Sequence, residues 1–234
     1  MKYLLFFIFP FSFTQAFTQV SNAQLKGNFA EISKLGRLQG GESLQNFANT
    51  SIKGSKYFEE NWETGSVTAN TGELINNNYV LLFDKQNHDL YVKEKTGTEI
   101  ILLDKKQVKQ FSIGNHTFLS GSLVAGEPDK FYEVLAGKEN GIALYKLINT
   151  KFIKADKQDL ERIKRGDFDD EYRDDITYFI KLPNQPLQKI KLNENSLLKV
   201  LPDESKRIKE FFNNRGNNEI DQKFISALIT SLNS

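Results

Sequence analysis

Short apolar runs separated by turn residues fill the stretch from Trp62 to Phe118. The runs are Tyr79–Phe83, Leu90–Val92, Ile100–Leu103, and Phe111 with Ile113. Each run is bounded by Gly, Asn or Asp and is too short for a helix, which is typical of β-strands. Because the connections are also short, neighbouring strands are predicted to be antiparallel.

The faces of each run predict its place in the sheet. Tyr79–Phe83 is apolar on both faces and is therefore predicted to be a central strand. In the next run Leu90 and Val92 share one face. The polar residues Asp89 and Lys93 share the other face, so this side of the strand is predicted to be solvated. A second set of strands is predicted at Phe131–Leu135, Ile142–Ile148, Ile176–Ile180 and Leu187–Leu192.

Helices are predicted only after Asn193, where the apolar period changes from two residues to 3.6. Pro202 ends a first short helix, Asp203 caps a second, and Gly216 ends that second helix. A third helix is predicted to carry one continuous apolar stripe, made of Phe224, Ile225, Leu228, Ile229 and Leu232. Helices of this length are unstable alone, so the stripes are expected to pack on one another or on the sheet.

The first residues have the pattern of an export signal. Lys2 supplies the positive charge, residues 3–13 are apolar, and small residues follow. Cleavage is predicted after Ala16 or after Ala23, with the second site preferred, so that the mature chain begins at Gln24. The apolar run is too short to span a bilayer, so the mature chain is predicted to have no transmembrane anchor and to be periplasmic or extracellular.

Two stretches lack apolar periodicity and complete the predicted organisation. A signal peptide at 1–23 is followed by a weakly structured leader at 24–54, an antiparallel β body at 55–193 and C-terminal helices at 194–234 that pack on the body. Within the body, residues 154–175 are mostly charged and are predicted to form a long solvated loop. The predicted fold class is mainly β, of the α+β type, with an antiparallel curved sheet or a sandwich-like body and a short C-terminal helical hairpin.

Composition excludes several kinds of chemistry. The 31 Lys and Arg residues nearly balance the 30 Asp and Glu residues, so net charge gives no reason to expect a nucleic-acid partner. The absence of Cys excludes a disulfide, a thiol nucleophile and a zinc ribbon. The glycine patterns that bind dinucleotides and nucleoside phosphates are also absent from the sequence, and no cofactor is predicted.

The acidic run from Asp167 to Asp175 raises a metal hypothesis. Counted from Asp167, the sixth and twelfth positions hold Tyr172 and Tyr178, where a calcium-binding EF-hand loop needs Gly and Glu. The EF-hand motif therefore fails. A looser calcium site at Asp167, Asp169 and Glu171 is a weak alternative to an ordinary solvated loop.

His88 and His116 are the two imidazoles of the chain. Each lies beside a predicted turn, and neighbouring strand residues point to opposite faces, so Asp89 is not expected to orient His88. Both are therefore predicted to be surface residues without a catalytic role, and no catalytic residue is assigned.

Aromatic residues on the predicted strands are candidates for a ligand groove, since their faces bind apolar ligands and carbohydrates. The candidates are Trp62, Tyr79, Tyr91, Tyr132 and Tyr145. Aromatic residues are also common in strands simply because they pack well there, and this alternative remains open.

Several short motifs are similar to those of a known group. They are Gly54-Ser55-Lys56-Tyr57, Trp62-Glu63-Thr64-Gly65-Ser66-Val67, Asn78-Tyr79, Asp89-Leu90-Tyr91-Val92, Phe131-Tyr132-Glu133-Val134-Leu135, Tyr178-Phe179-Ile180 and Leu201-Pro202-Asp203. In this layout the chain resembles a family of short exported Bacteroidetes-type proteins of uncharacterised function. The resemblance implies a β-rich body followed by C-terminal helices, and it implies no activity.

Three functional hypotheses follow from the sequence. The preferred one is a non-enzymatic cell-envelope or periplasmic module that binds an envelope protein or a polymer. The second is a carrier that holds an apolar or lipid-like ligand on a curved β-sheet. The third is a hydrolase that acts through carboxylates.

Overall fold

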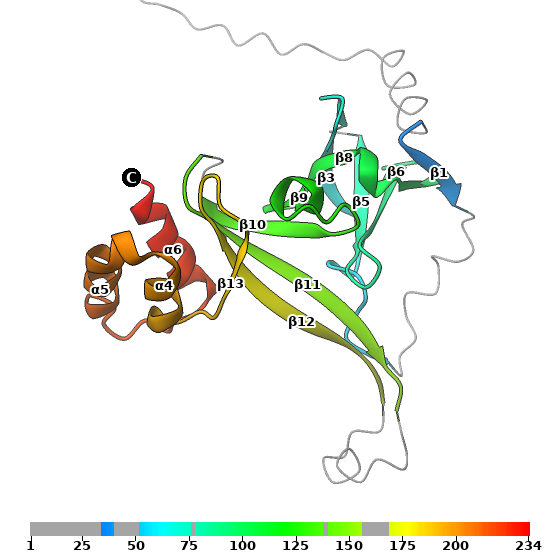
Figure 1. Cartoon of the computed structure of the whole chain (residues 1–234). Coiled ribbons are helices and arrows are strands. Elements are labelled where there is room, and N and C mark those ends of the chain that lie inside the picture. The colour runs from blue at the N-terminus through cyan, green and yellow to red at the C-terminus, as the bar shows by residue number, and fades with distance from the viewer. Residues whose placement is uncertain (1–33, 40–51, 76–77, 138–139, 156–168) are drawn as a thin grey trace, which may run out of the picture.

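The fold was analysed in a computed structural model that describes residues 34–39, 52–75, 78–137, 140–155 and 169–234. About 44% of the described chain is β-strand, in one open sheet whose strands follow the order β1-β7-β6-β5-β3-β8-β9-β10-β11-β12-β13. The helices α4, α5 and α6 lie together at one end of the molecule, and strands β1 and β3 to β9 form a body at the other (Figure 1). The predicted β-rich α+β class is confirmed.

The body is a strongly curved part of the sheet. Its strands are β1 (Gly36–Gln39), β3 (Glu63–Ala69), β4 (Leu74–Ile75), β5 (Tyr79–Asp84), β6 (Asp89–Glu94), β7 (Ile100–Leu103), β8 (Val108–Ile113) and β9 (His116–Ser120). The start of β3 pairs with β5, and its later part pairs with β4 on one edge and with β8 on the other. Because β3 changes partner along its length, the sheet bends around a common interior.

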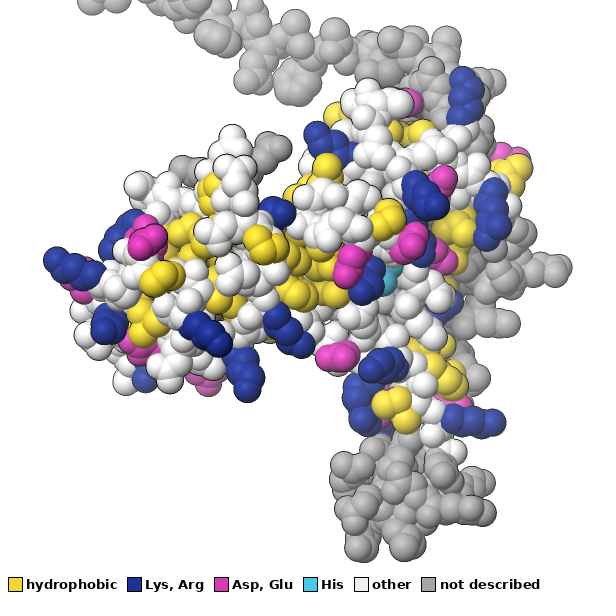
Figure 2. All heavy atoms as spheres, in the orientation of Figure 1, with side chains coloured by type: hydrophobic (Ala, Val, Ile, Leu, Met, Phe, Trp, Pro, Cys, Tyr) yellow, Lys and Arg dark blue, Asp and Glu magenta, His cyan; other side chains and the backbone are white. Residues whose placement is uncertain are grey.

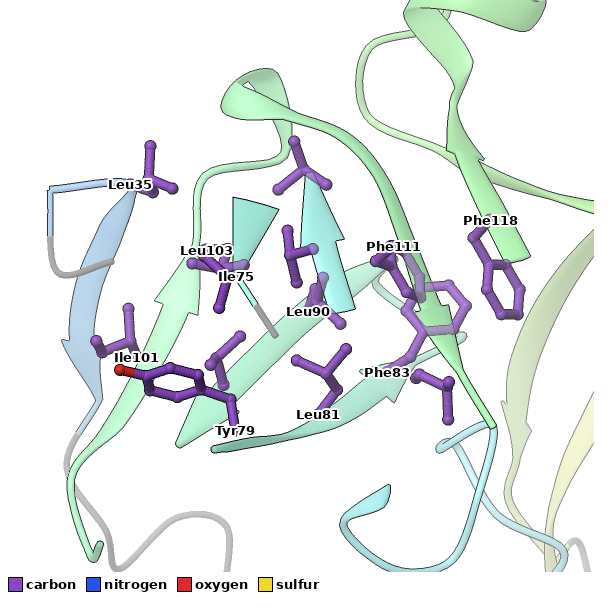
Figure 3. Close-up of a cluster of buried hydrophobic side chains, with 14 of the residues drawn as sticks. Leu35, Ile75, Tyr79, Leu81, Phe83, Leu90, Ile101, Leu103, Phe111 and Phe118 are labelled. Atoms are coloured by element: carbon purple, nitrogen blue, oxygen red, sulfur yellow. The ribbon is translucent and has the colours of Figure 1, made fainter. Parts of the chain in front are cut away.

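Aromatic and aliphatic side chains fill the interior of the body. β5 pairs with β6 on one side and with β3 on the other, which confirms that it is a central strand. Its Tyr79, Leu81 and Phe83 are each about 1% exposed. The rings of Phe111 and Phe118 stack with centroids 4.7 Å apart, and Phe83 lies 5.1 Å from each of them. Figure 3 shows these rings in one cluster with the aliphatic residues of β6 and β7.

The second part of the sheet contains its longest hairpin. It consists of β10 (Phe131–Gly137), β11 (Ala143–Ile153), β12 (Asp170–Lys181) and β13 (Gln188–Ile190). β10 pairs with β9, so the two parts of the sheet are continuous. All of these pairs are antiparallel; a parallel pair is formed where β2 (Ile52–Lys53) lies beside the start of β12. Hairpin β11–β12 extends well past β10 (Figure 1).

The C-terminal helices cover one face of this second part. They are α4 (Glu194–Val200), α5 (Ser205–Asn213) and α6 (Gln222–Leu232), with the 3₁₀ turn η3 (Pro202–Glu204) before α5. Asp221 caps α6 by accepting a hydrogen bond from Phe224 N at 2.8 Å. The whole predicted stripe of α6 is buried, against Leu144 and Ile180 of the sheet and Ile208 and Phe212 of α5.

Three predictions about local structure are wrong. Asp170–Asp175, expected within the solvated loop 154–175, belongs to β12 and pairs with β11 in regular register. In the leader predicted at 24–54, Gly36–Gln39 and Ile52–Lys53 are strands of the sheet. A short helix, α2 (Gly121–Val124), and the 3₁₀ turn η2 (Lys105–Gln107) lie before Asn193, where no helix was expected. The rest of the predicted loop, 156–168, lies outside the described residues.

Candidate functional site

A groove of about 520 Å³ lies on the face of the sheet that the C-terminal helices leave open. Its floor contains Tyr132, Leu147 and Phe179. Its walls are α2 with the loop after it, and the β12–β13 loop with Leu187. Figure 2 shows hydrophobic side chains gathered in a band across the middle of the molecule, with charged side chains beside it.

Strand alternation explains why these side chains share one face. Tyr132 follows Phe131 on β10 and precedes Glu133, so its ring and the Glu133 carboxylate point to opposite sides of the sheet. Tyr145 lies opposite Phe179 in the β11–β12 register, and both belong to the groove-side cluster. The alternate residues Leu144 and Ile180 pack under the helices instead. The second part of the sheet therefore has an apolar layer on each face, and the helices cover only one of them.

The rim of the groove carries ordered charges. Tyr132 Oη donates a hydrogen bond to Glu127 Oε2 at 2.8 Å, and Lys130 Nζ lies 3.1 Å from the same oxygen. These two contacts lower the pKa of Glu127, and burial, followed by the hydrogen bond to Glu127, raises the pKa of Tyr132. Across the groove, Lys181 Nζ donates to the carbonyl oxygen of Val124 at 2.9 Å. The groove thus combines an apolar floor with a polar, hydrogen-bonded rim.

The structure separates the predicted aromatic ligand set into three places. Tyr132 lines the groove, and Tyr145 is buried in the cluster beneath it. Tyr79 is 1% exposed inside the body core, where no ligand reaches it. Trp62 and Tyr91 belong to a separate small cluster on the body, where Lys93 Nζ lies 4.9 Å from the centroid of the Trp62 ring. The five aromatic residues predicted to share one ligand groove therefore lie in three separate places.

A second group of polar residues lies on the helix-covered face of the sheet. Glu133 is 2% exposed, and its carboxylate is held by His116 Nδ1 at 2.6 Å and by Lys146 Nζ at 2.5 Å. Lys146 also donates to Gln222 Oε1 of α6 at 3.3 Å. These contacts balance the buried carboxylate and fix the start of α6, so the group is best explained as an architectural ion-pair network.

His88 is buried, and the prediction that it is a surface residue is wrong. It is 5% exposed, in the turn between β5 and β6, with a positive φ of 54°. Phe131 N donates to its Nδ1 at 3.2 Å, and its Nε2 lies 3.3 Å from Asn149 Oδ1. The turn itself is held by Asp84, whose Oδ1 accepts hydrogen bonds from the backbone of Gln86 and Asn87. The side chain of His116 is 42% exposed, and it contacts the buried carboxylate of Glu133.

The weak metal candidates do not form a ligand set in the described residues. Asp169 makes an ion pair with Lys53 at 3.4 Å, and Glu171 makes one with Arg173. Across the described part of the chain, no group of three or more His, Asp or Glu side chains is arranged to hold a metal ion. Asp167 lies outside the described residues.

Comparison with protein families, curated proteins and solved structures finds no match to this chain. None of the helices in the described ranges is long and apolar enough to cross a membrane. The groove itself is therefore the basis for a functional conclusion.

Sequence reasoning identified Tyr132 but missed Leu123, Glu127 and Lys181. The missed residues come together only when the α2 loop folds over the sheet. One usable signal was present: Ile142–Ile148 and Ile176–Ile180 are apolar on both faces, which predicts cover on both sides of the sheet.

Proposed function

We propose that this chain is an exported, non-enzymatic binding module that holds an extended segment of an envelope protein in the groove over β10 to β12. The observation that carries the proposal is the apolar floor at Phe179 and Leu147 with exposed apolar and charged residues around it. Its volume of about 520 Å³ lies within the range of ligand sites, roughly 300 to 1,000 Å³. Export is proposed from the signal pattern of residues 1–23.

The carrier hypothesis has less support than the binding module. A carrier needs space inside the curved sheet, and the stacked rings of Phe111, Phe118 and Phe83 occupy the interior of the body. The hydrolase hypothesis needs a carboxylate that is available to substrate, and Glu133 is buried between His116 and Lys146. A binding module that uses the groove needs neither an empty interior nor an available carboxylate.

Leu123 gives a direct test of the groove, because it is 50% exposed on the groove wall and its replacement leaves the core intact. Heptapeptides displayed on phage would be selected on the immobilised chain without its signal peptide, and the selected peptides measured by fluorescence anisotropy. We expect Leu123→Glu to weaken binding about ten-fold or more, since a charge would then face an apolar ligand.

The matched control is Leu74→Glu, at a leucine that is 54% exposed on the body and outside the groove. This variant should bind the selected peptides like the wild type. The proposal would be contradicted if both variants lost the same binding affinity or if both bound the peptides as tightly as the wild type. It would also be contradicted if no selected peptide bound saturably.

A further inference from the structure

The groove has an unequal number of positive and negative side chains. Its charged lining residues in the described chain are Glu127, Lys130 and Lys181. Glu127 and Lys130 neutralise each other at 3.1 Å, and Tyr132 supplies a further hydrogen bond to the carboxylate. One positive charge, on Lys181, is left over beside the apolar floor.

Lys181 is positioned by the same strand that supplies the apolar floor. It lies two residues after Phe179 on β12, so both side chains emerge on the groove face. Its cross-strand neighbour is Ala143, whose small side chain leaves room for the lysine stem. Among the described contacts, its ammonium group donates one hydrogen bond, to the Val124 carbonyl oxygen. An ammonium group has three donors, so this contact leaves capacity for an anion.

The spacing of these two side chains defines the ligand. Two residues along a strand correspond to about 7 Å, which is also the distance between same-face side chains of an extended peptide. A carboxylate satisfies the ammonium group better than a second neutral acceptor, because charge-assisted hydrogen bonds are shorter and stronger.

We infer that the groove selects an extended polypeptide segment in which Asp or Glu stands two residues from a large apolar residue. The apolar side chain packs on Phe179 and Leu187, and the carboxylate binds the Lys181 ammonium group. This inference rests on the proposed function and adds the chemical class of its ligand.

The test uses the heptapeptides selected on the wild-type chain, each paired with a twin in which Asp is changed to Asn or Glu to Gln. We expect the acidic peptide to bind the wild-type chain about ten-fold more tightly than its amide twin, as for one hydrogen bond to a charged group. Lys181→Met retains the aliphatic stem and should remove this difference, whereas Lys181→Arg should retain it. Lys199→Met, at an exposed residue of α4, is the control and should behave as the wild type.

The outcomes separate this inference from the proposed function. If the peptides bind in the groove, as judged by Leu123→Glu, but acidic and amide twins bind equally, the carboxylate assignment is overturned and the binding module stands. The same conclusion follows if the acidic preference survives in Lys181→Met. If no peptide binds saturably, both proposals fail together.

Discussion

At the scale of single residues, His88 joins the two parts of the sheet through both ring nitrogens. Because Nδ1 accepts from Phe131 N, the ring hydrogen is on Nε2 and is donated to Asn149 Oδ1. If Nδ1 were protonated as well, its N–H group would face the backbone N–H group of Phe131. Burial also lowers the pKa of His88, because the charged imidazole loses its hydration.

The buried His88 predicts a stability loss in mild acid. Its pKa in the folded chain lies below the value of about 6.5 expected after unfolding, so the unfolded chain takes up the proton first. The stabilising contribution of His88 is complete above pH 6.5 and declines as the pH falls below it, until the folded-state pKa is passed. We expect the free energy of unfolding, measured with urea, to be lower at pH 5.5 than at pH 7.5.

His88→Asn is the control for this effect, since Asn tolerates the positive φ and does not titrate. The variant should be less stable than the wild type at pH 7.5 and should lose less stability on going to pH 5.5. An equal pH dependence in His88→Asn and the wild type would show that His88 is not its source.

At the scale of elements, α6 shows how a helix too short for independent stability is held. Leu228 is fully buried between α5 and the sheet. Leu228→Ala removes part of that packing and leaves a cavity, so we expect a loss of about 2 to 5 kcal/mol in the free energy of unfolding. Chemical denaturation of the purified chain would measure it.

Thr230→Ala, at an exposed position of the same helix, should change the free energy of unfolding by no more than about 0.5 kcal/mol. If Leu228→Ala were as stable as this control, the stripe would not be the structural support of α6. The burial of all five stripe residues indicates that this face is architecture rather than a docking surface.

Among the elements, some could be predicted from the sequence and others could not. Tyr79–Phe83 and the α6 stripe were predictable because their apolar periods match a central strand and an amphipathic helix. Asp170–Asp175 was not, since this part of hairpin β11–β12 is solvated and its strand pairing leaves no apolar alternation. The burial of His88 and the meeting of Lys181 with α2 depend on contacts between distant segments, which local pattern does not contain.

At the scale of the whole molecule, the β5–β6 turn connects the body with hairpin β11–β12. Lys85 of this turn is 8% exposed, and its Nζ lies 2.8 Å from Asp174 Oδ2 of β12. Thr150 of β11 donates to the other oxygen of the same carboxylate at 2.6 Å. Among the described pairs, β10 faces β11 only from Ala143 to Lys146, so these contacts lie beyond that pairing and support the extended part of the hairpin.

Neutralising Asp174 should therefore loosen this support. Asp174→Asn leaves a nearly buried ammonium group without its anion, and we expect a loss of about 1 to 3 kcal/mol in the free energy of unfolding. The neighbouring variant Asp175→Asn is a matched control, because its ion pair with Lys151 is exposed and 3.8 Å long. It should change the free energy of unfolding by no more than about 0.5 kcal/mol.

Amide hydrogen exchange would locate the effect within the molecule. In Asp174→Asn, exchange should rise along β11 after Ile148 and along the facing part of β12, while the core amides of Tyr79–Phe83 keep their protection. This pattern is expected because the body and the helices each retain a separate core. Uniform acceleration through both cores would instead mean that the ion pair stabilises the whole molecule and does not act on the hairpin alone.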